Sequence, residues 1–162
     1  MILIALGSNQ SGPWGNPRHT VARALAALNQ GGIRLRRASR PVVSAPFGRA
    51  GQPDFVNAVA EVETRLPPAA LLARLHVIER QAGRRRTLRW GPRTLDLDLL
   101  DYHGRIAPAP ARPQLPHPGI AGRIFVLAPI AEIAPLWRHP ESRQTAATLL
   151  RRLDPAGGGR LL

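Results

Sequence analysis

The sequence contains no cysteine and no lysine, only 4% aromatic residues, and no apolar run long enough to span a membrane. Without cysteine the chain can form neither a disulfide nor a thiolate metal site, which is typical of a reducing compartment. The apolar residues 1–6 have no basic segment before them and are too few for a signal peptide. We therefore expect a soluble, cytoplasmic protein without membrane contacts.

The missing lysines also limit how phosphate could be bound. All 23 basic residues are arginines, against 10 acidic residues, and the formal net charge is +13. Neither the phosphate-binding loop lysine nor the strand lysine of protein kinases is possible, so arginines and metal ions must hold the phosphates of any bound ATP. A nucleic-acid partner would also suit this charge, but the few aromatics are not interleaved with the arginines as a base-stacking surface requires.

The 162 residues, 44% of them hydrophobic, can bury one core, so we expect a single domain over residues 1–162. Apolar spacing predicts strands at residues 2–6, 33–43, 55–64 and 94–99. It predicts helices ending near residue 30, over residues 67–82 and over 145–153, with a third helix or extended wall at 120–133 broken by Pro129. This order favours an α+β ferredoxin-like sandwich, in which helices cover one face of a mainly antiparallel sheet.

The most informative strand lies at residues 94–99, where leucines and polar residues alternate. Asp96 and Asp98 share one face, with Cα atoms roughly 6.6 Å apart, and two such carboxylates can converge on a pair of Mg²⁺ ions. Charged residues on a strand often serve only solubility or edge protection, so the pair alone is weak evidence.

Arginines strengthen the metal hypothesis, because five of them directly precede the carboxylates. They are Arg84, Arg85, Arg86, Arg89 and Arg93. Guanidinium groups bind phosphate oxygens in pairs, and carboxylates for metal beside arginines for phosphate are typical of a phosphoryl-transfer site.

A second candidate lies on the strand at residues 55–64. Val56, Ala58 and their alternating neighbours indicate a core face, which leaves Phe55 and Asn57 together on the other face. A ring and a carboxamide side by side could stack on and hydrogen-bond a flat nitrogen heterocycle. A packed phenylalanine and a turn-capping asparagine are the more common explanation of such a pair.

Four motifs together resemble the 6-hydroxymethyl-7,8-dihydropterin pyrophosphokinase (HPPK) family. They are Leu-Gly-Ser-Asn at residues 6–9, Gln-Pro-Asp-Phe-Val-Asn at 52–57, Arg-Trp-Gly-Pro-Arg-Thr-Leu-Asp-Leu-Asp at 89–98, and Pro-His-Pro followed by Arg-x-Phe at 116–125. The resemblance implies transfer of the terminal pyrophosphoryl group of ATP to the hydroxymethyl group of a reduced pterin, with release of AMP. It also implies a lid over ATP at residues 84–90.

The resemblance implies roles for individual residues. Asp96 and Asp98 would hold two Mg²⁺ ions and, with Arg84 and Arg93, form the catalytic set. The pterin-binding residues would be Ser44, Ala45, Pro46, Phe47, Phe55, Asn57 and Phe125. The ATP-binding residues would be His76, Glu79, Arg84, Arg86, Trp90, Arg93, Leu99, Arg112, Gln114, Leu115, His117 and Arg123.

Two other classes of protein share part of this pattern. A basic ferredoxin-like module that binds RNA without catalysis would be indifferent to Asp96 and Asp98. A two-metal nuclease or nucleotidyl transferase would need the carboxylates but not Phe55, Asn57 and Phe125. The pyrophosphokinase uses both sets, and we expect a monomer that binds ATP and the pterin and no nucleic acid.

Overall fold

The computed structural model describes residues 1–46, 50–85 and 92–153. Its centre is a five-stranded sheet in which every pairing is antiparallel. The strands are β1 (Ile2–Ser8), β2 (Ile33–Ala38), β3 (Val42–Ser44), β4 (Phe55–Thr64) and β5 (Asp96–Tyr102). They lie in the order β2-β4-β1-β5, and β3 also pairs with β4. β1 is therefore flanked by β4 and β5, the two strands that carry the candidate site residues.

Helices α1 (Pro17–Ala27) and α2 (Pro68–Gln81) cover one face of the sheet. Both begin at a proline, whose fixed φ suits the first helical turn, and Asn16 caps α1 by accepting the His19 N–H at 3.0 Å. The apolar residues of both helices pack on alternate residues of β1, β4 and β5, and together they form the first core. The buried helical members of this first core are Val21, Ala24, Leu71, Leu75 and Ile78.

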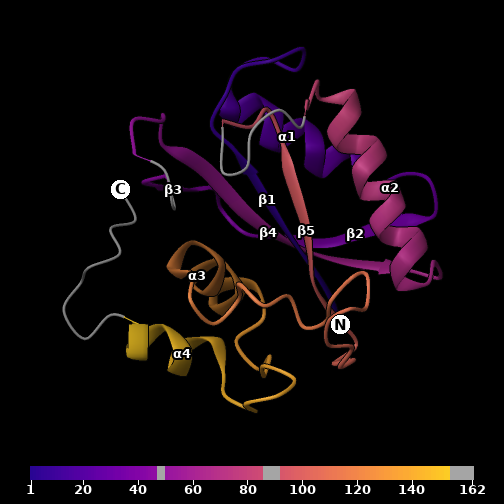
Figure 1. Cartoon of the computed structure of the whole chain (residues 1–162), viewed down its shortest axis with the longest axis vertical. Helices are drawn as coiled ribbons and strands as arrows, with labels where there is room; N and C mark the ends of the chain where they lie inside the picture. Colours follow the sequence, from indigo (N-terminus) through magenta and orange to yellow (C-terminus); the bar gives the residue numbers. More distant parts are fainter. Residues whose placement is uncertain (47–49, 86–91, 154–162) are drawn as a thin grey trace.

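Helices α3 (Ile124–Ile133) and α4 (Ala146–Leu153) lie on the opposite side of the sheet, as Figure 1 shows. A second core forms there, where Val126, Leu127 and Ile130 of α3 pack with Leu3 and Val59 of the sheet. The α+β sandwich is confirmed, but the expectation of helices on one face was incomplete. The first and second cores share one sheet.

Three local predictions differ from the structure. The strand expected at residues 33–43 is divided into β2 and β3, because Pro41 interrupts it. Pro129 lies inside α3 and does not break it, although proline has no N–H to donate to the preceding turn. The strand expected at 94–99 begins at Asp96 and continues to Tyr102. By contrast, β4 has the predicted bounds and the predicted core face.

None of the helices in the described part of the chain is long and apolar enough to cross a membrane.

Candidate active site

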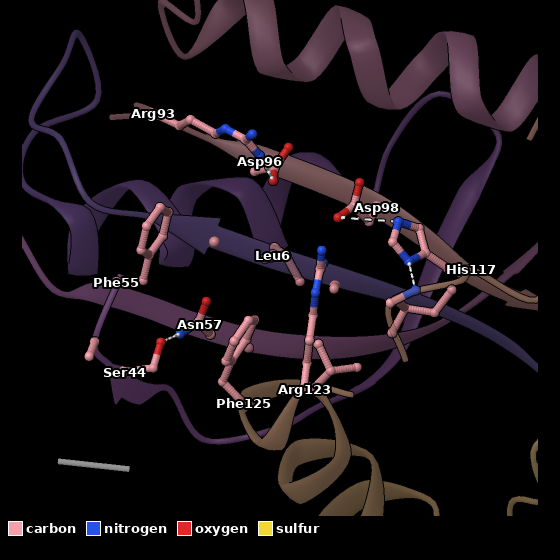
Figure 2. A pocket seen from close by; sticks show the side chains of 17 residues that line it. Leu6, Ser44, Phe55, Asn57, Arg93, Asp96, Asp98, His117, Arg123 and Phe125 are labelled. Atoms are coloured by element: carbon pink, nitrogen blue, oxygen red, sulfur yellow. Dashed lines mark hydrogen bonds and ion pairs between the residues drawn. The ribbon is translucent and has the colours of Figure 1, made fainter. Parts of the chain in front are cut away.

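The candidate site is a hollow over β1, on the face of the sheet that α3 and α4 only partly cover (Figure 2). Gly7 of β1 pairs with Asn57 of β4 on one side and with Asp96 of β5 on the other. The hollow has about 760 Å³ of empty space, a figure that includes its opening to solvent. Antiparallel pairing thus brings the two candidate motifs to either side of one glycine.

Asp96 is held by two arginines. Its Oδ1 accepts a hydrogen bond from Arg84 Nη1 at 2.6 Å, and its Oδ2 pairs with Arg93. Arg84 follows α2 and Arg93 precedes β5, so the two guanidinium groups reach the carboxylate from the two ends of the arginine-rich segment. They also stand where they could pair with phosphate oxygens.

Asp98 lies one pleat further along β5 and faces the same hollow. Burial, followed by the nearby Asp96 carboxylate, raises the pKa of Asp98 to about 7, although Arg123 acts in the opposite direction. Two neighbouring carboxylates that resist joint ionisation would be stabilised by a cation between them. Asp96 and Asp98 therefore fit a site for a hard divalent cation such as Mg²⁺.

The carboxylate pair does not form a complete metal cage. Within the described residues no group of three or more His, Cys, Asp and Glu side chains could hold a metal ion. Mg²⁺ commonly binds to one or two carboxylates and takes its other ligands from water and substrate phosphates. The donor set here suits that kind of shared site.

His117 lies beside Asp98, with Nε2 at 3.8 Å from Asp98 Oδ2. Burial and the nearby Arg123 guanidinium lower the pKa of His117 to about 4, so the imidazole is neutral at pH 7. The Gly119 N–H donates to Nδ1 at 3.0 Å, which places the remaining proton on Nε2. The His117 N–H in turn donates to the Leu100 carbonyl of β5 at 2.8 Å, and this bond fixes the loop beside the carboxylates.

Two aromatic rings and a side-chain amide line the other half of the hollow. Phe55 and Phe125 approach it from β4 and α3 and lie on its two sides in Figure 2. Between them, Asn57 is 5% exposed and donates through Nδ2 to the Ser44 hydroxyl at 2.8 Å. A slot between two rings, with an amide at its base, suits a flat heterocycle that offers hydrogen-bonding groups on one edge.

A comparison with known protein families matches residues 3–135 to 7,8-dihydro-6-hydroxymethylpterin-pyrophosphokinase (HPPK). The chain belongs to the HPPK family. The match ends before α4, whose residues are Ala146–Leu153.

Relatives and a solved structure agree with this assignment. The chain is 43% identical over 143 residues to a 2-amino-4-hydroxy-6-hydroxymethyldihydropteridine pyrophosphokinase of Pseudomonas aeruginosa, covering 88% of this chain and 85% of the relative. The same-named protein of Haemophilus influenzae is 44% identical over 131 residues, 81% of this chain and 79% of its own. A crystal structure titled HPPK-DHPS in complex with substrates matches with a TM-score of 0.69 at 11% identity, which supports the fold alone. It covers 93% of this chain and 43% of that longer chain.

The residues expected on the adenine side of the HPPK site do not line the hollow described above. The side chains of Leu99 and Leu115 are buried in the first core, so only their backbone could contact a nucleotide. Arg112 is exposed and Gln114 half-buried in the loop after β5. His76 and Glu79 line a second hollow together with Arg80 and Arg84.

Glu79 has a structural position that the sequence pattern did not reveal. It is 3% exposed, accepts the Leu97 N–H of β5 at 2.9 Å, and pairs with Arg84. Burial raises the pKa of Glu79, while the bonds from Leu97 and Arg84 act against that shift. Glu79 therefore joins α2 to the outer edge of β5 and holds the arginine that reaches Asp96.

The remaining expected residues either lie at the hollow or fall outside the described part of the chain. Ser44 and Ala45 line the hollow and Pro46 follows them directly, while Arg93, Arg123 and His117 line its other half. Phe47, Arg86 and Trp90 lie outside the described residues, as does most of the expected lid.

Sequence reasoning assigned no role to Gly7, Asn9 or Gly119. Gly7 and Gly119 line the hollow. The Asn9 side chain accepts the Arg93 N–H at 2.8 Å and donates to the Pro53 carbonyl at 3.1 Å. Asn9 thus ties the segment before β5 to the segment before β4. The Leu-Gly-Ser-Asn motif at residues 6–9 includes Gly7 and Asn9, but only the fold shows which residues they contact.

Proposed function

We propose that the hollow over β1 is where this HPPK family member carries out its reaction. The protein transfers the terminal pyrophosphoryl group of ATP to the hydroxymethyl group of 6-hydroxymethyl-7,8-dihydropterin, a step of folate biosynthesis. The pterin hydroxyl oxygen forms a bond to the β-phosphorus of ATP, and the bond from that phosphorus to the oxygen bridging to the α-phosphorus breaks. AMP leaves with the bridging oxygen, and the hydroxyl proton is released.

One observation carries this placement: Asn57 and Asp96 are direct neighbours of Gly7 on opposite sides of β1. A ring bound beside Asn57, with its substituent toward β5, would have only one strand to cross before the substituent reaches the carboxylates. Such proximity converts a bimolecular step into an intramolecular one, which is a main source of rate enhancement in phosphoryl transfer.

On the pterin side, Phe55 and Phe125 would stack on the two faces of the ring. Asn57 would bind its polar edge, and Ser44 would orient the Asn57 amide through the 2.8 Å hydrogen bond. Ala45, Pro46 and Phe47 would complete the wall of the slot.

On the phosphate side, Arg84, Arg93 and Arg123 would pair with ATP oxygens, and neutral His117 would donate through Nε2–H. When Mg²⁺ is bound at Asp96 and Asp98, it neutralises phosphate charge and orients the oxygens for in-line transfer. We propose two such ions, and adenine contacts from His76, the backbone at Leu99 and Leu115, and the side chains of Arg112 and Gln114.

We further propose a cytoplasmic monomer that uses ATP and the pterin as small-molecule substrates and has no nucleic-acid partner. No side chain in this scheme requires a second copy of the chain.

Phosphorus NMR of the purified protein with ATP, Mg²⁺ and 6-hydroxymethyl-7,8-dihydropterin tests the reaction. AMP and a pterin diphosphate should appear together, and neither should form when pterin or Mg²⁺ is omitted. Production of ADP or free pyrophosphate would contradict the transfer chemistry.

The site itself is tested by Asp96→Ala and Asp98→Ala, with Glu141→Ala, in an exposed turn outside the family match, as the control. We expect each site variant to lose turnover by at least about a hundredfold, as expected when charge stabilisation at a reacting group is removed. Circular dichroism should show an unchanged fold. Activity retained in both site variants would refute the assignment.

A further inference from the structure

Gly7 lies at the centre of the hollow, and its backbone conformation does not require glycine. Its φ is not among the positive values that favour glycine. It lies within a regular strand, between the buried Leu6 and Ser8, and glycine weakens a strand interior. The backbone conformation would therefore accept a larger residue. We infer that glycine is needed here because a side chain would enter the hollow that Gly7 lines.

That space is bounded by two groups of the ring slot. A Cβ atom placed on Gly7 would lie 3.2 Å from Asn57 Oδ1 and 3.7 Å from Phe55 Cδ1. The first distance is tighter than an ordinary van der Waals contact, and Asn57 cannot swing away freely because its amide is bonded to Ser44. A methyl group here would press on the two side chains that define the edge of the slot.

Gly7 also separates the two halves of the hollow. Its partner on β4 is Asn57 and its partner on β5 is Asp96, so any ligand that touches both must cross Gly7. A side chain on Gly7 would rise between the ring and the carboxylates.

We propose that Gly7 is a specificity-determining residue of the pterin site. Its bare backbone leaves room for a flat bicyclic ring to lie against Asn57 while the ring's hydroxymethyl substituent reaches across β1 toward Asp96 and Asp98. This inference rests on the proposed function, and it assigns to Gly7 a selective effect on the pterin and not on ATP.

The test compares Gly7→Ala with Gly122→Ala, which adds the same methyl group where nothing lies within 4 Å. Gly122 is exposed and its φ is not positive, so the control variant is free of strain. Calorimetry would measure 6-hydroxymethyl-7,8-dihydropterin binding in the presence of Mg²⁺ and a non-hydrolysable ATP analogue. A separate titration would measure the analogue alone.

We expect Gly7→Ala to weaken pterin binding by about tenfold or more, the effect of forcing a methyl group into an occupied contact. Its affinity for the ATP analogue should stay within about twofold of the parent. Its melting temperature should fall by no more than a few degrees, because alanine suits a strand with negative φ and so offsets part of the strain of the contact with Asn57. In turnover assays the KM for pterin should rise more than the KM for ATP. Gly122→Ala should match the parent in all these measurements.

Equal pterin affinity in Gly7→Ala and the parent would overturn the proposal. Equal losses for pterin and nucleotide would also overturn it, because the methyl group would then disturb the whole site and not only the slot. If the parent protein itself failed to bind the pterin, the proposed function would fail, and this result is distinct from the others.

Discussion

Asp98 has a carboxyl group whose ionisation is unfavourable in the folded protein. Its carboxyl group is half-buried in the hollow, and this burial, followed by the neighbouring Asp96 carboxylate, raises the pKa to about 7. Folding therefore favours the protonated form over the ionised one. As pH rises from about 4 to about 7, the unfolded state releases this proton first, and the contribution of Asp98 to the free energy of unfolding falls.

Asp98→Asn should remove this pH dependence. Without Mg²⁺ and at pH 8, we expect the variant to melt at a higher temperature than the parent, while near pH 4 the two should melt alike. The measurement is thermal unfolding by circular dichroism in the presence of a chelator, with Asp54→Asn as the exposed control. Identical melting temperatures at pH 8 would show that burial and the neighbouring Asp96 do not disfavour the ionised form of Asp98.

The same variant separates stability from function. Mg²⁺ and an ATP analogue should raise the melting temperature of the parent but raise that of Asp98→Asn much less, because a neutral amide is a weaker ligand for a hard cation.

At the scale of elements, one buried hydrogen bond joins β5 to the chain that follows α3. Asp101 pairs with Leu3 of β1, so its side chain faces the second core. It accepts the Trp137 Nε1–H at 2.7 Å and the Gly104 N–H at 2.9 Å, and Asp101 is 2% exposed. Since α3 carries Phe125, this bond helps to hold the outer layer against the strand that carries Asp96 and Asp98.

Trp137→Phe should keep an aromatic ring in the second core, although a smaller one, and lose the hydrogen bond to Asp101. Leaving a buried carboxylate short of one donor should lower the free energy of unfolding by about 1–3 kcal/mol. Urea denaturation measures this change. Trp14→Phe is the control, since Trp14 is half-buried and contacts Arg23 through its ring face at 5.3 Å.

For the control we expect a smaller loss, below about 1 kcal/mol, because the Trp14 ring is only half-buried against the first core. Equal losses in both variants would mean that ring volume, and not the Asp101 bond, determines the cost.

At the scale of the whole molecule, the first and second cores share one sheet, with β1 and β4 contributing side chains to both. Loss of the sheet would expose both cores at once. The expected single domain should therefore unfold in one cooperative transition. Tryptophan fluorescence, to which Trp137 of the second core contributes together with Trp14 and Trp90, and far-ultraviolet circular dichroism should give coincident denaturation curves. Two separated transitions would contradict the single domain.

The net charge of +13 is also a property of the whole molecule. A strongly positive surface attracts anionic substrates over distances that salt screens. We expect kcat/KM for ATP to fall several-fold between about 50 and 300 mM NaCl, with little change in kcat. The salt series of initial rates measures this, and a parallel series with sucrose controls for viscosity. A flat profile would restrict the role of the arginines to direct contacts.

The sequence determined the local features of this protein. Alternation over residues 55–64 predicted β4 and its core face, and alternation over 94–99 placed Asp96 and Asp98 together. The prolines at residues 67 and 68 marked where α2 begins. These features depend on neighbours within a few residues, so a local pattern is enough to predict them. The HPPK resemblance, also read from the sequence, is confirmed by the family match.

Only the tertiary structure decided how the parts meet. Strand order placed Asn57 and Asp96 on either side of Gly7, and packing put α3 on the second face and buried Glu79. The pKa values of Asp98 and His117 follow from the same burial. Register, burial and electrostatics arise from residues far apart in the chain, and no local period encodes which distant segments become neighbours.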